Sequence, residues 1–278
     1  NNGYFSSNSV IKKVYREGVV LLSGGRAILL QLAHPFVAAG VDDYSNFQAE
    51  ILKRLYRTLS FMQNLVFEDR RRARAALQHF HALHEKIRGR LPHDAGRFPA
   101  GTPYSGTDPD AKLWVHATFV DTSLKVYERF ISPLTMNERR SFYTDTLVLA
   151  RLMEIPDEIL PQTLEDFDNY MKSALSGDTL AVTGTAKRLA NAVLYPRVGF
   201  LPSISAGLLR LVTAGILPER FQREFGLKWN RTRQFALNGF AFLIRSLRPV
   251  VPPWIWQNPL LKGKLTYFLL WGKHTSNK

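Results

Sequence analysis

The sequence predicts an all-α protein that folds as one large helical domain. Apolar residues recur with helical spacing along most of the chain, and no alternating strand pattern, repeat or low-complexity tract interrupts them. Helix start signals precede two of these segments, at Asp108-Pro109 and at Thr135-x-x-Glu138. The 278 residues suffice for a substantial core. We expect the domain to span residues 1–248, with residues 249–278 as a Trp/Lys-rich C-terminal segment.

The first 35 residues are expected to form two apolar helical stretches, and a turn-rich connection is expected after them. The two stretches are predicted to break at Gly24-Gly25, and Pro35 ends the second. His34 would then cap the C-terminus of that helix, where the dipole favours a cation. The connection FVAAGVDDYSNFQ follows, with Ser45 as the N-cap of the next helix.

A helix is predicted from about Phe47 to Phe67, because its apolar residues have 3.6-residue spacing. Arg54, Arg57 and Thr58 form a stripe beside that apolar face. Arginines in such a position either reach solvent or meet an anion. The residues alone leave both interpretations open.

A second helix is predicted from Glu68 to Arg90, with an exposed cluster of arginines at its start. His84 falls on its apolar stripe, whereas His79 and His81 point progressively away. A single histidine on an apolar face is more often a core residue than a ligand. The pattern therefore identifies His84 as a candidate without deciding between these roles.

The rest of the chain is predicted to be a loop followed by further helices. Residues 91–110 read as a long ordered loop anchored by Tyr104. The next helix is apolar on most sides and is expected to be central, so His116 and Asp121 inside it need partners. The later helices are expected near residues 136–155, 160–175, 178–194, 202–214, 217–226 and 231–246.

Composition narrows the possible ligands. The chain has 37 lysines and arginines against 23 acidic residues, a net charge of +14, which favours an anionic partner. Signatures of nucleic-acid binding are missing, so we expect no nucleic-acid partner. The absence of cysteine excludes disulfides, iron–sulfur clusters and thiolate-ligated haem. Hydrolase, zinc-protease, Walker and Rossmann motifs are also missing.

The C-terminal segment mixes tryptophans and leucines with lysines and prolines. It either packs across the domain or makes a peripheral contact with an anionic membrane. No apolar run reaches the ~18 residues of a membrane span. We expect a cytoplasmic protein that can lie peripherally on a membrane, and an upstream targeting segment stays an open alternative.

Five blocks, in order, resemble the catalytic domain shared by MpaB-type oxygenases and rubber oxygenases (latex clearing proteins). The resemblance spans roughly Gly18 to Leu175. The matching blocks are LLSGGRAILLQLAHPFVAAGVDDYSNF, RLYRT, HALHEKIRG, YSGTDPDAKLWVHATFVDT and SPLTMNERRSFYTD. Together they are far more specific than any one of them.

The resemblance implies an all-α, globin-reminiscent bundle that binds one haem b and, with O₂, cleaves carbon–carbon double bonds of a hydrophobic, isoprenoid substrate. His84 matches the proximal iron ligand of the family. Arg54 and Thr58 match its Arg/Thr pair near the haem, and His116 matches the histidine of its W-V-H block, for which we expect a supporting role. Oligomeric state is left undetermined.

Arg57 departs from the rubber oxygenases, which have at this position a lysine that can ligate iron. A guanidinium offers no lone pair, so Arg57 is expected to donate to dioxygen or to a haem propionate instead. The catalytic glutamate of that branch has no secure counterpart, and we do not expect Asp42 or Asp43 to replace it. Two alternatives remain: a non-catalytic haem- or lipid-binding protein of the same fold, and a protein without haem in which His84 is a core residue.

Overall fold

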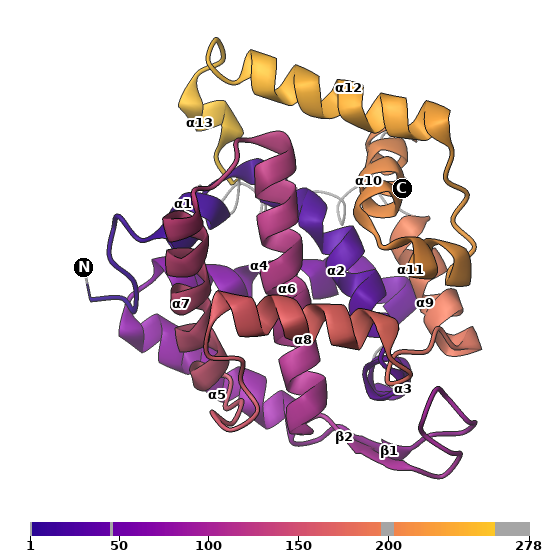
Figure 1. The fold of residues 1–278 in the computed structure, drawn as a ribbon. Coiled ribbons are helices and arrows are strands. Elements are labelled where there is room, and N and C mark those ends of the chain that lie inside the picture. Colours follow the sequence, from indigo (N-terminus) through magenta and orange to yellow (C-terminus); the bar gives the residue numbers. More distant parts are fainter. Residues whose placement is uncertain (1, 45–46, 196–202, 259–278) are drawn as a thin grey trace, which may run out of the picture.

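A computed structural model describes residues 2–44, 47–195 and 203–258, and for residues 47–55 and 203–205 it describes the backbone alone. The structure is 67% helical, which confirms the all-α prediction. The helices surround α6 (Pro109–Phe130), which runs through the middle of the molecule (Figure 1). Whether residues 1–248 form a domain separate from the C-terminal segment stays a prediction.

The other elements are α1 (Val10–Tyr15), η1 (Gly18–Leu22), α2 (Ser23–Leu32), α3 (Pro35–Tyr44), α4 (Phe47–Phe67), α5 (Arg70–His84), β1 (Arg88–Arg90), β2 (Pro103–Ser105), α7 (Met136–Leu152), α8 (Leu164–Ser176), α9 (Gly184–Leu194), α10 (Ser203–Ile216), α11 (Glu219–Glu224), α12 (Arg231–Leu247) and α13 (Pro253–Trp256).

Helix α6 begins and is buried as its sequence predicts. The side chain of Asp108 accepts a hydrogen bond from the Ala111 amide at 2.8 Å, and Pro109 occupies the first turn. Helix α2 packs along α6, where the indole of Trp114 donates to the Leu30 carbonyl at 2.8 Å. These contacts make α2 and α6 the centre of the fold.

The charged residues inside this centre form ion pairs. Arg26 of α2 is fully buried, and its guanidinium lies 2.7 Å from the carboxylate of Asp121. Lys125 contacts the same carboxylate at 2.8 Å. Burial alone would raise the pKa of Asp121, but the two cations outweigh it and hold that pKa below its usual value. Asp121 therefore has the partners that its position in an apolar helix requires.

Two predictions about the N-terminal third are wrong. Helix α2 begins at Ser23 and includes Gly24 and Gly25, so the helix does not break there. Gly25 instead allows close packing, because a Cβ at this position would lie 1.9 Å from Oγ1 of Thr213. The segment after Pro35 is a helix, α3, rather than a turn-rich connection. Pro35 thus starts a helix, as proline can at a first position. Ser45, the predicted N-cap, lies outside the described residues.

The region around residue 90 also differs from prediction. Helix α5 ends at His84, and residues 88–90 pair antiparallel with residues 103–105, Gly89 opposite Tyr104. The predicted ordered loop therefore contains one strand of a small sheet. Gly89 permits this pairing, because a Cβ there would lie 2.5 Å from the Tyr104 hydroxyl oxygen. Tyr104 is buried, as expected of an anchor.

Other boundaries agree with the sequence. Helix α4 spans Phe47–Phe67 as predicted, and the capping box of Thr135 and Glu138 starts α7. In the part of the chain that the structure describes, no single helix is long and apolar enough to cross a membrane. The pair formed by residues 18–32 and 35–44 meets the length and composition test together, but it bends by 104°.

Candidate functional site

Helices α4 and α5 form a hairpin that carries most of the predicted site. Only Glu68 and Asp69 connect them, and Asp69 caps α5 by accepting a hydrogen bond from the Arg72 amide at 2.9 Å. The rings of Phe61 and Phe80 stack across the hairpin with their centroids 4.9 Å apart. This stacked pair shows which residues of the two helices lie at the same height along the hairpin axis.

Arg57 and Thr58 lie one turn before Phe61 in α4, and His84 lies one turn after Phe80 in α5. Because consecutive helices joined by a short turn run antiparallel, these steps lead to the same level of the hairpin. The structure therefore brings Arg57 and Thr58 level with His84. Arg57 is exposed and Thr58 is half-buried, while the side chain of Arg54 lies outside the described residues.

His84 is half-buried, and its geometry suits a metal ligand. Its Nδ1 lies 2.8 Å from the carbonyl oxygen of Phe80, and the two rings contact each other with centroids 4.0 Å apart. Since a carbonyl oxygen only accepts, Nδ1 is the protonated nitrogen here, and in the neutral ring Nε2 is the nitrogen that carries the lone pair. Metal-binding histidines are commonly fixed in this way, with one ring nitrogen donating to a carbonyl.

The end of α5 that carries His84 is held by the small sheet. The amide of Gly106, directly after β2, donates to the Ile87 carbonyl at 2.9 Å. A Cβ at Gly106 would lie 2.5 Å from the carbonyl oxygen of His84, so the backbone approaches α5 closely here. This contact fixes the position of the helix end, and a glycine in a turn is its one sign in the sequence.

His116 lies on α6. It is 5% exposed, burial lowers its pKa to about 4, and its Nε2 has no hydrogen-bond partner among the described residues. The imidazole is therefore neutral at pH 7. The hydrogen bonds of the described residues do not join Nε2 to Arg57 or Thr58.

His34 is a second buried, neutral histidine that sequence reasoning misassigned. It is 2% exposed and lies beside the rings of Phe36 and Phe98, at centroid distances of 5.4 and 6.0 Å. Burial, with a smaller contribution from Arg97, lowers its pKa to about 4. The predicted role as a cationic cap is wrong, because the ring is buried against Phe36 and Phe98 and is neutral at pH 7.

Asp42 and Asp43 both have structural partners. Asp42 forms a two-pronged ion pair with Arg188, at 2.9 and 2.8 Å. Asp43 accepts a hydrogen bond from the hydroxyl of Tyr104, and burial together with this carboxylate raises the pKa of that tyrosine. The two acids connect α3 to α9 and to the small sheet.

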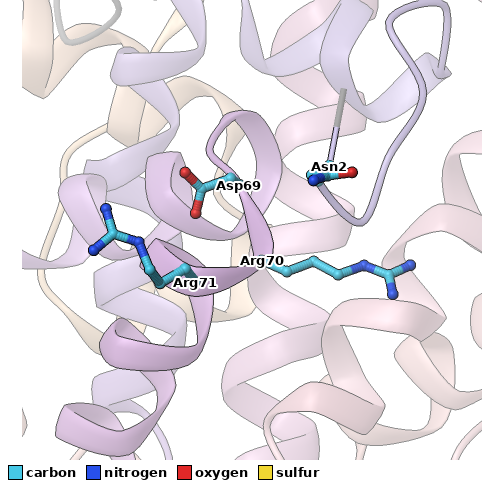
Figure 2. A pocket seen from close by; sticks show the side chains of 5 residues that line it. Asn2, Asp69, Arg70 and Arg71 are labelled. Carbon is cyan, nitrogen blue, oxygen red and sulfur yellow. The ribbon is translucent and has the colours of Figure 1, made fainter.

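Two hollows on the surface have linings that do not include His84. The larger, of about 660 Å³, is lined by Asn2, Gly3, Asp69, Arg70 and Arg71. Figure 2 shows Arg70 and Arg71 extending to opposite sides of the start of α5. His84 is at the other end of this helix, roughly 21 Å away at 1.5 Å per residue. The second hollow, of about 350 Å³, adjoins Gly96 and Asp178.

The described residues contain no cluster of three or more histidine, cysteine or acidic side chains that could hold a metal ion. Haem does not require one, because its macrocycle supplies the other ligands and one histidine suffices to hold the iron. The orientation of His84 by its Nδ1 hydrogen bond and its half-buried position suit an axial ligand of haem. The residues present thus fit a haem better than a bare metal ion.

A protein-family model described as "ER-bound oxygenase mpaB/B'/Rubber oxygenase, catalytic domain" matches residues 12–246. No significant match was found among curated proteins or among solved structures. The matched range includes the α4–α5 hairpin, the small sheet and all of α6.

Proposed function

Because the chain belongs to the family of the mpaB and rubber oxygenase catalytic domain, we propose that it is an oxygenase that uses haem b. The observation that carries the cofactor assignment is the hydrogen bond between Nδ1 of His84 and the Phe80 carbonyl. In the neutral ring it assigns the proton to Nδ1, so that Nε2 would ligate the iron, and it orients the plane of the ring. When bound, haem b supplies the activation of O₂ for oxidation of a substrate.

His84 would hold the haem iron, and Arg57 and Thr58 would line the haem site beside it. Arg57 carries a permanent charge and several donors, which suits a haem propionate or dioxygen in the site. It has no lone pair and so cannot replace a lysine ligand. Arg54 is assigned to the same part of the haem site as Arg57 because both belong to the RLYRT motif. His116 is assigned a role in supporting the site from α6.

The proposed substrate is hydrophobic, with an isoprenoid whose carbon–carbon double bond is cleaved as the specific candidate. Support comes from the family description, in which "rubber" denotes a hydrocarbon polymer with one double bond in each isoprene unit. We further propose a cytoplasmic location with peripheral contact to a membrane, where such substrates dissolve.

Absorption spectra of wild type and two histidine variants test the cofactor. We expect a Soret band in wild type, its loss in His84→Ala, and its retention in His79→Ala. His79 is the matched control because it lies on the same helix and is exposed. Haem binding that survives His84→Ala unchanged, or a wild type that neither contains nor takes up haem, would contradict the assignment.

Activity is tested separately, by exposing reduced protein to O₂ and an isoprenoid. Aldehyde or ketone products support the oxygenase, whereas haem-loaded protein that leaves the substrate unchanged supports the non-catalytic binding protein. A low-spin ferric spectrum with two nitrogen ligands that survives Arg57→Ala but not His116→Ala would show that the roles of these two residues are misassigned.

A further inference from the structure

Helix α12 is apolar on two opposite faces. Its inner face carries Leu237 and Ala241, which are buried, and Phe240, whose ring packs edge-on against that of Phe130. Its outer face carries Phe235 and Phe242, with 79% and 72% of their surfaces exposed. A surface helix ordinarily places polar residues outward, so the outer face needs a separate explanation.

The exposed apolar residues continue from α12 into α13. Among the described residues there are eleven large exposed hydrophobic side chains, and seven of them lie within residues 235–255. We call this set the outer strip. Its members are Phe235, Phe242, Leu243, Leu247, Val250, Trp254 and Ile255. Both helices lie at the upper edge of the molecule in Figure 1, so the strip follows one side of the fold.

The charged side chains of this part of the chain are all basic. Residues 225–278 contain nine lysines and arginines and no aspartate or glutamate, so they supply nine of the fourteen net positive charges. Arg245 and Arg248 contact the body of the protein, through the Glu128 carbonyl and the Glu17 carboxylate. Lys228 and Arg231 are exposed at the start of α12. Arg231 lies one turn before Phe235, so exposed cations border the outer strip at the start of α12.

We propose that α12 and α13 bind the surface of an anionic lipid bilayer, with the outer strip inserted at the level of the headgroups. Phenylalanine, leucine and tryptophan are suited to the boundary between headgroups and acyl chains, and the bordering cations to anionic headgroups. Helix α12 has 17 residues, about 25 Å, and would lie in the plane of the surface rather than cross it.

A second copy of the chain fits this surface less well. A two-fold dimer through α12 would place the strip against itself. Its bordering cations would then face each other with no acidic residue of the segment between them. An anionic bilayer complements the same charges.

Flotation of the full chain with lipid vesicles tests the proposal. We expect binding to vesicles that contain about a third phosphatidylserine, weaker binding to phosphatidylcholine alone, and loss of most of the difference in high salt. Phe235→Ser with Phe242→Ser should lower the partition coefficient about tenfold or more. Met136→Ser, at an exposed apolar residue on α7, is the matched control and should leave binding unchanged.

The charge contribution is tested by Arg231→Glu, which should weaken binding to the anionic vesicles about tenfold. Arg74→Glu makes the same change at an exposed arginine on α5 and should have little effect. A wild type that does not bind anionic vesicles, or binding that all four variants leave equal, would overturn the proposal.

Two further outcomes would assign the strip to another occupant. A wild type that is dimeric by sedimentation, and that Phe235→Ser with Phe242→Ser makes monomeric, would assign it to a second copy. A double variant that melts several degrees lower without losing vesicle binding would show that part of the same chain covers the strip. Because vesicle binding needs neither haem nor turnover, these results are independent of the proposed oxygenase function.

Discussion

Helices α2 and α12 have similar residue types in opposite surroundings. In α2, Arg26 is fully buried against Asp121, and Gly25 lies against Thr213. In α12, the phenylalanines at 235 and 242 face outward, and a Cβ at Gly239 would meet nothing within 4 Å. The comparison shows that the partner contributed by a distant part of the chain, rather than the residue type, decides what each position does.

The largest effect should come from removing the buried cation of α2. Arg26→Met keeps much of the side-chain volume but leaves Asp121 with Lys125 as its remaining cation, and it removes the hydrogen bonds to the Ile216 carbonyl and Thr122. Breaking a buried ion pair on one side costs about 3 to 5 kcal/mol. Urea denaturation followed by circular dichroism measures the change in the free energy of unfolding.

The exposed Arg231 of α12 provides the control. Arg231→Met should change the free energy of unfolding by less than about 0.5 kcal/mol. Adding Asp121→Leu to Arg26→Met should recover part of the loss, because no uncompensated charge then stays buried. Equal stabilities for Arg26→Met and Arg231→Met would remove the distinction between the two helices.

The interior near α2 and α6 should also be sensitive to pH, because burial lowers the pKa of both His34 and His116 to about 4. An unfolded histidine titrates near 6.5, so the unfolded state binds more protons below that pH. Stability is therefore complete above about pH 6.5 and falls as the pH drops toward 4. Between pH 7 and 5 we expect a loss of about 2 to 4 kcal/mol.

Urea midpoints at pH 7, 6 and 5 measure this loss. His116→Gln should reduce the slope by about half if the variant folds, whereas His79→Gln at an exposed position should not change it. The carboxylate of Glu138, whose pKa its hydrogen bonds with Lys13 and Thr135 lower to about 2, is ionised throughout this range in the folded state. A free energy of unfolding that stays constant from pH 7 to 5 would contradict burial of the two neutral rings.

Local signals in the sequence were sufficient for the fold class and several helix starts. Apolar spacing defined α4, and Asp108-Pro109 and the Thr135 capping box marked α6 and α7, because these signals act within one turn of the chain. The break at Gly24-Gly25 was predicted wrongly, since the reason for Gly25 is Thr213, about 190 residues away. Non-local packing of this kind leaves no periodic pattern.

The candidate site also has features that the sequence predicted and features that only the structure shows. His84 was identified by its face of α5 and by a family resemblance, and the structure adds the carbonyl that fixes its ring. The burial of His34 was missed because Pro35 signals a helix end as well as a helix start. The outer strip of α12 was also missed, because a helix with two apolar faces reads from its sequence as a buried one.

The smallest expected effect on stability comes from adding one methyl group to α2 and one to α12, which tests the same comparison between the two helices. Gly25→Ala would place a Cβ 1.9 Å from Oγ1 of Thr213, so the helices must separate or the threonine must rotate, at a cost of about 1 to 3 kcal/mol. Thr213→Ala in the same chain should recover part of this loss. Gly239→Ala has open space and should instead stabilise the protein by about 0.5 to 1 kcal/mol, through better helix propensity. Thermal and urea denaturation of the three variants would show opposite signs for α2 and α12, and a common sign would mean that backbone propensity rather than packing governs both positions.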